Sequence, residues 1–392
     1  MRKTGQALLV VVAILVGIGM LTLASATGLK GVAEKGDPFW YVRQQAMFLG
    51  VGVALATIAA FFDYHRFRSK PLLIGLAILT VLLLVLVFVP GFGAAVKGSR
   101  RWIRLVGLPI RVQPSEFAKL TVVVILSAWM ALKGRKAENL KEGLIIPLGV
   151  LGLILLLILA EPDLGTTVLL AATGVILLLA GGSRKSHVLV SCVLGACGLV
   201  LMVLQDPVRM KRLLAFARPE GYADARYQLT QSENAFFLGG LWGRGYGEGM
   251  QKLGFLPEAH NDFIFAVLGE ELGLPATLAV VALFAMLTVL GFRISRQAPD
   301  RFGCLLALGL TSLLALEAII NIGVVTGCLP TKGLALPFMS AGGSSLISSL
   351  VAVGMLINVA RHADGTDRHT RLTREFDEQA MDRALQGGDI FA

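Results

Sequence analysis

Long apolar runs separated by short polar segments dominate the chain. A span of about 17–25 mainly apolar residues is long enough to cross a bilayer as a helix. Ten segments meet this condition: 7–27, 46–62, 71–90, 115–132, 143–160, 164–181, 187–204, 273–292, 302–326 and 341–360. The fourth has the weakest signal, because Glu116 and Lys119 fall in its first turn. Since backbone in lipid must satisfy its own hydrogen bonds, these spans are predicted to be helices.

Composition agrees with this pattern, because 55% of the residues are hydrophobic and only 16% are charged. The sequence therefore predicts an all-α polytopic membrane protein with about ten transmembrane helices in a single domain, residues 1–360. Residues 361–392 are polar and charged and are predicted to form a cytoplasmic tail. Within that tail, residues 373–386 fit either a short amphipathic helix or a disordered segment.

The first apolar span begins in the way that a signal peptide does. Arg2 and Lys3 precede an apolar stretch that ends in a motif similar to a signal-peptidase site, residues 24–26. The apolar run is longer than the usual core of about 7–15 residues in a signal peptide, so we expect an uncleaved first helix. The four cysteines and five histidines are scattered, and their spacing predicts neither a metal site nor a disulfide framework.

Positive charge is distributed unequally between the two alternating sets of loops. The set that contains both termini has many basic residues in short connections: Arg66, Arg68, Lys70, Lys133, Arg135, Lys136, Lys141, Arg184, Lys185, Arg293, Arg296 and Arg301. The short loops of the other set hold only Lys30, Lys35, Arg43 and Lys332. Because cytoplasmic loops carry the excess of Lys and Arg, both termini are predicted to be cytoplasmic.

Two long segments on the predicted outer side, 91–114 and 205–261, are also basic. Long loops cross the membrane largely regardless of charge, so the basic residues of these two segments need not have a function. Alternatively, their Arg and Lys side chains bind an anionic ligand at the outer surface. The glycine-dense stretch 239–249 follows no strand and lacks the spacing of a phosphate-binding loop, so we expect no nucleotide or nucleic acid there. Its glycines favour a tight backbone path or a re-entrant segment.

The stretch "GFLPEAHNDFIFAVLGEELG", residues 254–273, concentrates ionisable groups beside an apolar run. Asp262 fits the N-cap of the following helix. However, Glu258 and His260 lie within four residues of it, and Glu270 and Glu271 follow where unpaired charge is costly. A carboxylate beside an apolar wall suits a general base, and cations facing it suit an anionic leaving group. This arrangement indicates group transfer from a phosphorylated lipid.

Six blocks, in order, resemble the SEDS proteins (shape, elongation, division and sporulation), which are polytopic peptidoglycan polymerases. The blocks are "KGSRRWI" (97–103), "QPSEFAK" (113–119), "EPDLGT" (161–166), "YQLTQSENAFFLGG" (227–240), "LPEAHNDFIFAVLGEELG" (256–273) and "NIGVVTGCLPTKGLALPFMSAGGSS" (321–345). The "LPTKGLALPF" run is most similar to the division type, with the elongation and sporulation types as close relatives. Three positions depart from the usual family pattern: Asn261, Glu317 and Ala341.

The resemblance implies an inverting glycosyltransferase that polymerises lipid II at the outer face of the bacterial cytoplasmic membrane, during division, and releases undecaprenyl pyrophosphate. Asp262 is the implied catalytic residue. The implied substrate-binding residues are Arg101, Gln113, Ser115, Glu116, Lys119, Glu258, His260 and Lys332. The outer segments 91–114, 205–261 and 327–340 would form the site. A divalent cation such as Mg²⁺ could assist, although no carboxylate cluster predicts a dedicated site for it.

The same resemblance implies partners: lipid II, undecaprenyl-pyrophosphate-linked glycan, membrane lipids, a class B penicillin-binding protein and other proteins of the division machinery. The competing hypothesis is a lipid II flippase that uses carboxylates within the membrane, Glu161, Asp163, Glu270, Glu271 and Glu317. The hydropathy pattern shows no inverted repeat of the kind that such carriers have, so we favour the enzyme.

Overall fold

All ten predicted spans are helices in the structure, a computed structural model that describes residues 2–96, 99–104, 111–217 and 221–363. They are α1 (Arg2–Lys35), α2 (Trp40–Phe61), α3 (Lys70–Leu86), α4 (Pro114–Lys133), α5 (Ile146–Ala160), α6 (Leu164–Ala180), α7 (Lys185–Gln205), α10 (Ile264–Arg296), α11 (Arg301–Val325) and a C-terminal helix, Gly343–Ala363. Among the described residues, eight helices are long and apolar enough to cross a membrane, and α3 and α6 are shorter. The predicted polytopic α-helical fold is confirmed.

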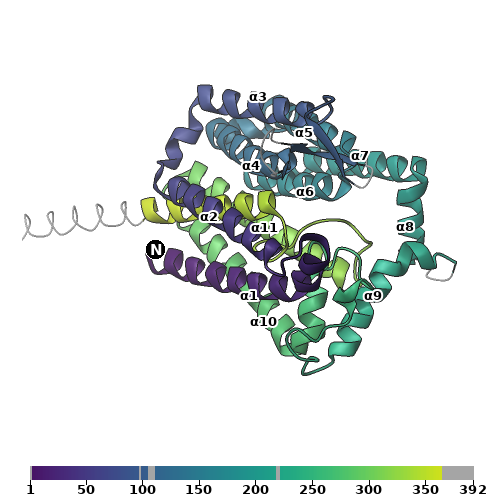
Figure 1. Ribbon diagram of the computed structural model, residues 1–392. Helices are drawn as coiled ribbons and strands as arrows, with labels where there is room; N and C mark the ends of the chain where they lie inside the picture. Colours follow the sequence, from purple (N-terminus) through teal and green to yellow (C-terminus); the bar gives the residue numbers. More distant parts are fainter. Residues whose placement is uncertain (1, 97–98, 105–110, 218–220, 364–392) are drawn as a thin grey trace, which may run out of the picture.

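Helices α4, α11 and the C-terminal helix form the most buried part of the bundle. Helix α11 packs against α4, α6 and α10, and α1 packs against α2 and α10. In contrast, Val188 is the only buried residue of α7, as expected of a helix that faces lipid. Figure 1 shows that α8 (Pro207–Ala217) leaves the end of α7 and runs across one end of the bundle to α9. This end carries the segments that were predicted to form the site.

The predicted long loop between the seventh and eighth spans is partly helical. It contains α8, α9 (Ala223–Gly239) and the 3₁₀ turn η4 (Gln251–Leu253). The sequence analysis had no sign of α8 and α9, because these helices carry too many polar residues to register as apolar spans. Further short helical turns connect the spans: η1 (Tyr64–Arg68), η2 (Gly134–Glu138) and η3 (Lys141–Ile145), which continues into α5.

A small antiparallel sheet, absent from the sequence-based prediction, lies in the segment 91–114. Its strands are β1 (Gly93–Val96), β2 (Ser99–Arg104) and β3 (Arg111–Val112), in the order β1-β2-β3. Ile103 pairs with Gly93 on one side and with Val112 on the other. Several predictions fall outside the described residues: Lys97, part of the loop at 105–110, Arg218 and the tail beyond residue 363.

Helix α10 begins nine residues before the predicted span and bends at Gly273, where φ is 72° and ψ is −164°. At this bend the segment 240–253, which contains most of the glycine-dense stretch 239–249, lies directly against the helix. A Cβ atom on Gly273 would stand 2.5 Å from the backbone nitrogen of Gly243, and one on Gly243 would stand 2.2 Å from the carbonyl oxygen of Glu271. The glycines therefore provide the tight backbone path that the sequence indicated.

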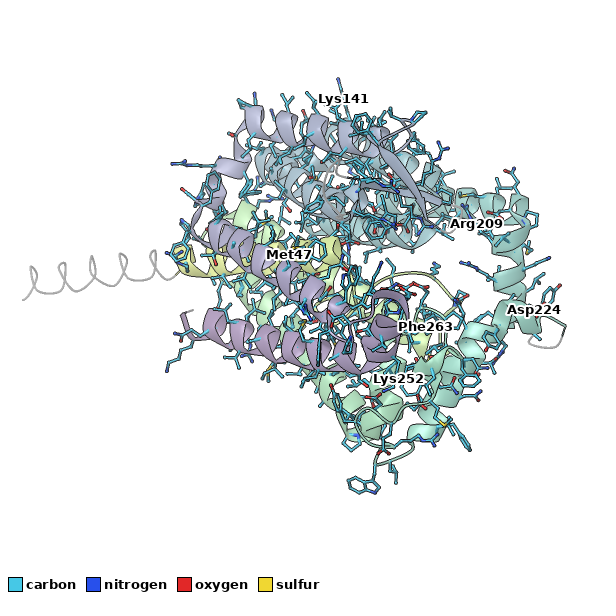
Figure 2. The ribbon with its side chains drawn as sticks, in the orientation of Figure 1. Met47, Lys141, Arg209, Asp224, Lys252 and Phe263 are labelled. Atoms are coloured by element: carbon cyan, nitrogen blue, oxygen red, sulfur yellow. The ribbon has the colours of Figure 1, made fainter. Side chains whose placement is uncertain are left out.

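Glu270 and Glu271, whose charge inside an apolar run suggested a function, hold this segment in place. The Glu270 carboxylate accepts hydrogen bonds from the backbone nitrogens of Met250, at 2.7 Å, and Gln251. Glu271 forms an ion pair with Lys252 at 2.5 Å and accepts a hydrogen bond from Ser25 of α1 at 2.6 Å. Both carboxylates are fully or almost fully buried. They are structural partners of the loop, and Figure 2 shows Lys252 at the same end of the bundle as Phe263.

Candidate active site

Asp262 lies in the turn that precedes α10, directly before the N-cap residue of that helix. The N-cap position belongs to Phe263, whose own side chain makes no cap hydrogen bond. The turn is held from two sides. The Asn321 side chain on α11 donates to the carbonyl oxygens of Asp262, at 2.9 Å, and Leu334, at 2.6 Å, and the backbone nitrogen of Ala341 donates to the carbonyl of His260. The N-cap of α10 thus falls on Phe263 rather than on Asp262, and the backbone of the turn that carries the Asp262 carboxylate is fixed.

The Asp262 carboxylate faces a cavity of about 420 Å³. Six of the nine predicted site residues line it: Arg101, Gln113, Glu116, Glu258, Asp262 and Lys332. The backbone of the last outer segment approaches the carboxylate closely, because a Cβ atom on Gly333 would lie 2.9 Å from Oδ2 of Asp262. Only glycine fits at position 333 while the carboxylate stays where it is. The neighbouring Lys332 is thereby brought to the same cavity.

Arg101 projects from β2 and is fixed over the turn between α5 and α6. Its Nε donates to the carbonyl oxygen of Glu161 at 3.0 Å, and Nη2 donates to that of Pro162 at 2.5 Å. Its Nη1 lies 3.9 Å from Oδ2 of Asp163, which in turn caps α6 through the backbone nitrogen of Thr166. Two backbone carbonyls and a carboxylate thus orient the guanidinium before any ligand arrives, which suits recognition of an oxyanion.

Burial changes the titration of two groups close to this cavity. Glu161 is fully buried, and neither carboxylate oxygen has a hydrogen-bond partner among the described residues. Burial, with the nearby charge of Asp163, raises the pKa of Glu161 to about 8. Burial thus favours the neutral form of Glu161 beside Arg101. Burial lowers the pKa of Lys332 below its ordinary value, because the ammonium loses part of its hydration.

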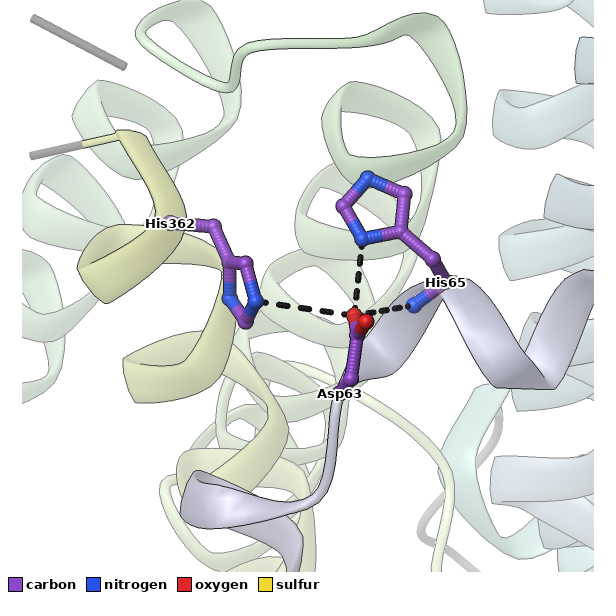
Figure 3. Close-up of side chains that lie close together, drawn as sticks. All are labelled: Asp63, His65 and His362. Carbon is purple, nitrogen blue, oxygen red and sulfur yellow. Dashed lines mark hydrogen bonds and ion pairs between the residues drawn. The ribbon is translucent and has the colours of Figure 1, made fainter. Parts of the chain in front are cut away.

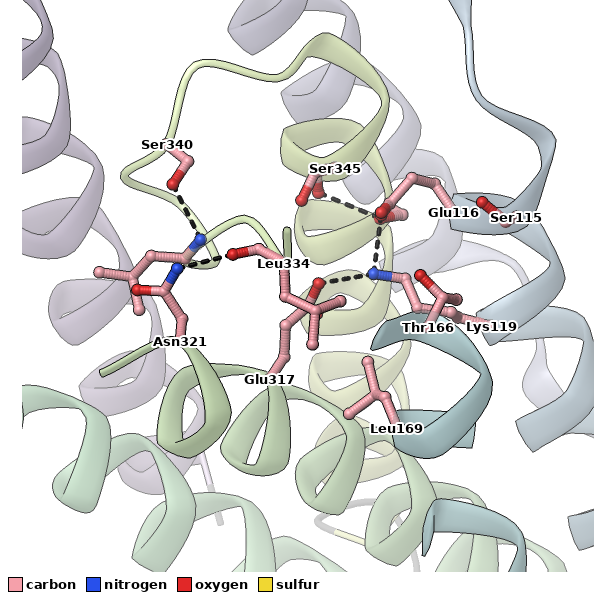
Figure 4. A network of polar contacts seen from close by, with 12 residues as sticks. Ser115, Glu116, Lys119, Thr166, Leu169, Glu317, Asn321, Leu334, Ser340 and Ser345 are labelled. Carbon is pink, nitrogen blue, oxygen red and sulfur yellow. Dashed lines mark hydrogen bonds and ion pairs between the residues drawn. The ribbon is translucent and has the colours of Figure 1, made fainter. Parts of the chain in front are cut away.

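Lys119, a predicted diphosphate ligand, lies in the interior of the bundle rather than on the cavity wall (Figure 4). Its Nζ lies 2.8 Å from Oε2 of Glu116 and 2.7 Å from Oε1 of Glu317. Ser348 of the C-terminal helix donates to the same oxygen of Glu116 at 2.9 Å. The Lys119 side chain is only 1% exposed, so its charge is already balanced by two carboxylates. The two charged residues that weaken the apolar signal of the fourth span are thus two of the three members of a buried ion cluster.

The other two predicted contacts also lie off the cavity of Asp262. Ser115 is fully buried and accepts a hydrogen bond from the Gln113 amide at 3.0 Å. His260 lines a second cavity of about 710 Å³, together with Trp40 and Tyr41, and its Nε2 lies 3.2 Å from Nζ of Lys30. This second cavity adjoins the first, because Trp102, Asn261, Ala341 and Gly342 line both.

A third cavity, of about 300 Å³, adjoins the cavity of Asp262. Its walls include apolar residues of α6, α7 and α8: Val168, Leu199, Val200, Val203, Leu204 and Leu213. The two cavities share three cations and one carboxylate, namely Arg101, Arg212, Lys332 and Asp163, together with Thr331 and Gly333. Three cations therefore stand where an apolar groove meets the polar cavity of Asp262.

Several residues of the Asp262 cavity were not predicted from the sequence to contact a ligand. They are Trp102, Asp163, Thr166, Arg212, Gln228, Asn261 and Thr331. Most of them stand inside the quoted sequence blocks, which was an available signal. Arg212 had a weaker signal, since it was one of many basic residues in the segment 205–261. Its position on α8 could not be inferred without knowing that this segment is helical.

Similarity to known proteins covers almost the whole chain. Residues 6–365 match the FtsW/RodA/SpoVE family, described as cell cycle proteins. A probable peptidoglycan glycosyltransferase FtsW of Geobacter metallireducens is 40% identical over 351 residues, 89% of this chain and 92% of the relative. Stage V sporulation protein E of Bacillus subtilis is 38% identical over 369 residues, 92% of this chain and 99% of the relative.

Two solved structures have the same fold. A chain of a peptidoglycan synthase complex, in which polymerization and crosslinking are coordinated, has a TM-score of 0.74 and 26% identity, covering 91% of this chain and 97% of its own. The rod shape determining protein RodA of Thermus thermophilus has a TM-score of 0.66 and 26% identity, covering 90% and 95%. With the match over residues 6–365, these likenesses show that the chain belongs to the FtsW/RodA/SpoVE family of polytopic membrane proteins.

Proposed function

We propose that the protein is a peptidoglycan glycosyltransferase that polymerises lipid II into glycan strands and acts in cell division. The relatives named FtsW support the activity and the division role. The proposal rests mainly on the order in which apolar, cationic and polar surfaces follow one another along the site. An apolar groove leads to three cations, and these lead to a polar cavity that contains Asp262.

This order of environments matches a lipid-linked sugar diphosphate. The prenyl chain would lie in the groove formed by α6, α7 and α8, where burial of apolar surface is favourable. The diphosphate would then meet Arg101, Arg212 and Lys332 at the junction. Its sugar would enter the cavity of Asp262, and the adjoining cavity lined by Trp40, Tyr41 and His260 has room for a second saccharide.

In the proposed reaction, Asp262 is the general base. Its carboxylate takes the proton of the acceptor's 4-hydroxyl while the hydroxyl oxygen attacks the anomeric carbon of the lipid-linked glycan. The bond from that carbon to the diphosphate oxygen breaks, and undecaprenyl pyrophosphate leaves with the electron pair. Arg101 and Lys332 stabilise the negative charge that develops on the diphosphate. Glu258 accepts a hydrogen bond from Asn261 at 2.6 Å, which orders the turn that presents the base.

Three of the five carboxylates that the flippase hypothesis invoked have structural partners within the protein. Glu270 and Glu271 bind the glycine-dense segment, and Glu317 pairs with Lys119. A carrier needs a site that opens to both sides near the middle of the membrane. The cavities described above all lie at one end of the bundle.

The direct test is polymerisation of labelled lipid II by the purified protein, alone and with a class B penicillin-binding protein. That partner is proposed because a similar chain belongs to a peptidoglycan synthase complex. We expect glycan polymer in at least the complex. Transport of lipid II between leaflets, without polymer in either sample, would contradict the proposal and favour the flippase.

Variants of Lys332 supply a matched comparison in the same assay. Lys332→Ala should reduce turnover, whereas Lys332→Arg should retain part of it because the charge is kept. Since burial lowers the pKa of Lys332, the native protein should lose this charge at a lower pH than an ordinary lysine would. Arginine stays charged, so Lys332→Arg should keep its turnover further into the alkaline range.

We also propose that both termini are cytoplasmic and that the protein works at the division septum. Single cysteines placed at 135 and at 331 distinguish the two faces of the membrane. A membrane-impermeant thiol reagent added to intact cells should label residue 331 and spare residue 135. Labelling of residue 135 from outside would reverse the orientation.

A further inference from the structure

Asp63, His65 and His362 form a compact cluster away from the site (Figure 3). Oδ1 of Asp63 lies 2.7 Å from Nδ1 of His65 and 3.5 Å from Nε2 of His362. One ligand atom from each residue lies within 4.8 Å of the other two. The three side chains are 36–48% exposed, so an ion could reach them from water.

The cluster stands at the opposite end of the bundle from Asp262. Gln45, near the start of α2, donates to the carbonyl of Ser340 beside the active site, whereas Asp63 follows the end of the same helix. The 22 residues of α2 span about 33 Å, which separates the two ends. The cluster therefore belongs to neither the cavities nor the reaction proposed above.

Regular elements hold the three side chains. Asp63 caps η1 by accepting a hydrogen bond from the backbone nitrogen of His65. Asn358, one turn before His362, donates to the carbonyl oxygens of Ala59, at 2.6 Å, and Phe62, which ties the C-terminal helix to the end of α2. The geometry of the cluster thus depends on helix packing rather than on a flexible loop.

The second nitrogen of each imidazole limits what can lie between the three side chains. Nδ1 of His362 lies 3.0 Å from the carbonyl oxygen of Asn358, to which it can only donate. In a neutral His362, Nε2 then carries a lone pair directed at the Asp63 carboxylate. Two acceptors facing each other repel, so either a proton or a metal ion belongs between them. A backbone carbonyl that fixes the tautomer in this way is a usual feature of metal-binding histidines.

We propose that Asp63, His65 and His362 bind a Zn²⁺ ion. Imidazole and carboxylate groups are suitable zinc ligands, with distances of about 2.0–2.2 Å. Two ligands of a tetrahedral zinc ion lie about 3.3 Å apart, close to the separation of Asp63 and His362. Zn²⁺ would replace the proton that joins Asp63 to His65, and their distance would increase by roughly 0.6 Å on the same geometry.

The surroundings fit this assignment. Nε2 of His65 lies 3.9 Å from Oδ1 of Asp300, the N-cap of α11, so a carboxylate stands behind His65 where a backbone carbonyl stands behind His362. Tyr64 also hydrogen-bonds Asp300. The bound ion would join the end of α2, η1 and the C-terminal helix. The sequence analysis predicted no metal site, because Asp63 and His65 are far from His362 in the chain.

The test uses full-length protein without a polyhistidine tag, in detergent or lipid, titrated with Co²⁺ and then with Zn²⁺. We expect one Co²⁺ per chain, visible-region absorption typical of a tetrahedral site, and displacement by Zn²⁺. His65→Asn and His362→Gln should each weaken Zn²⁺ binding at least about tenfold, since loss of even an outer partner costs about 10–100-fold.

His187→Gln is the matched control, because it removes a histidine on α7 outside the cluster. Asp63→Asn is a further variant that keeps the cap of η1, so it should fold even where a histidine variant does not. Equal Zn²⁺ binding by His187→Gln, His362→Gln and Asp63→Asn would overturn the proposal, as would the absence of stoichiometric binding by the native chain. Neither result would bear on the polymerisation of lipid II, which is measured separately.

Discussion

Replacing Asp262 with asparagine is expected to reduce glycan polymerisation by about 10²- to 10⁴-fold, the usual contribution of a general base. Asparagine keeps the size of the side chain and much of its hydrogen bonding, but it accepts no proton at the pH of the reaction. The turn that carries residue 262 is held by Asn321 and Ala341 through backbone carbonyls, which this change leaves intact. The thermal stability of the variant should therefore stay near that of the native protein.

Asp262→Glu is the matched variant, since it keeps the charge and moves it by roughly an ångström. Displacement on that scale can cost about 10²-fold, so little activity should return. Polymerisation at the native rate by Asp262→Asn would show that another group takes the proton.

Replacing Lys119 with methionine is expected to destabilise the fold by about 3–5 kcal/mol, the usual cost of leaving buried charge without its partner. Glu116 and Glu317 would face each other within the bundle, where their repulsion is weakly screened. Thermal unfolding in detergent measures the effect. Lys141→Met is the control, because Lys141 is exposed and its replacement should change stability by no more than about 0.5 kcal/mol.

The triple variant Glu116→Gln, Lys119→Met, Glu317→Gln removes all three charges and should recover most of the lost stability. A direct contact between Lys119 and the diphosphate predicts the opposite pattern. In that case, Lys119→Met would unfold at the same temperature as the native protein but would lose its polymerisation activity. The triple variant would have the same stability as Lys119→Met. The comparison therefore separates a substrate ligand from a buried ion cluster.

The helical fold could be predicted because each span had to satisfy its own backbone in lipid. That physical rule applies to one segment at a time, so hydropathy was enough even for α4, with its charged first turn. Hydropathy did not predict α8 and α9, because their polar composition resembles that of a loop. The strands β1–β3 were also missed, since pairing between short strands depends on partners elsewhere in the chain.

The sequence predicted many of the residues of the site, but it did not predict how they are arranged in space. Arg101, Glu258, Asp262 and Lys332 come from distant parts of the sequence and line one cavity. However, the sequence could not show that Lys119 is enclosed by two carboxylates or that His260 faces another cavity. Charge at an unusual position indicates that a partner is needed, as Glu270 and Glu271 illustrate, but it does not tell whether the partner is a substrate or the protein itself.

The contact between Gly243 and Gly273 also constrains how related sequences can diverge. Each glycine makes room for the backbone of the other segment, and each has a positive φ that disfavours other residues. A side chain at either position would push the segment 240–253 away from α10. Once the two backbones separate, the steric reason for glycine at the second position disappears as well. The two positions should therefore be retained together or lost together during evolution, as a pair rather than as independent sites.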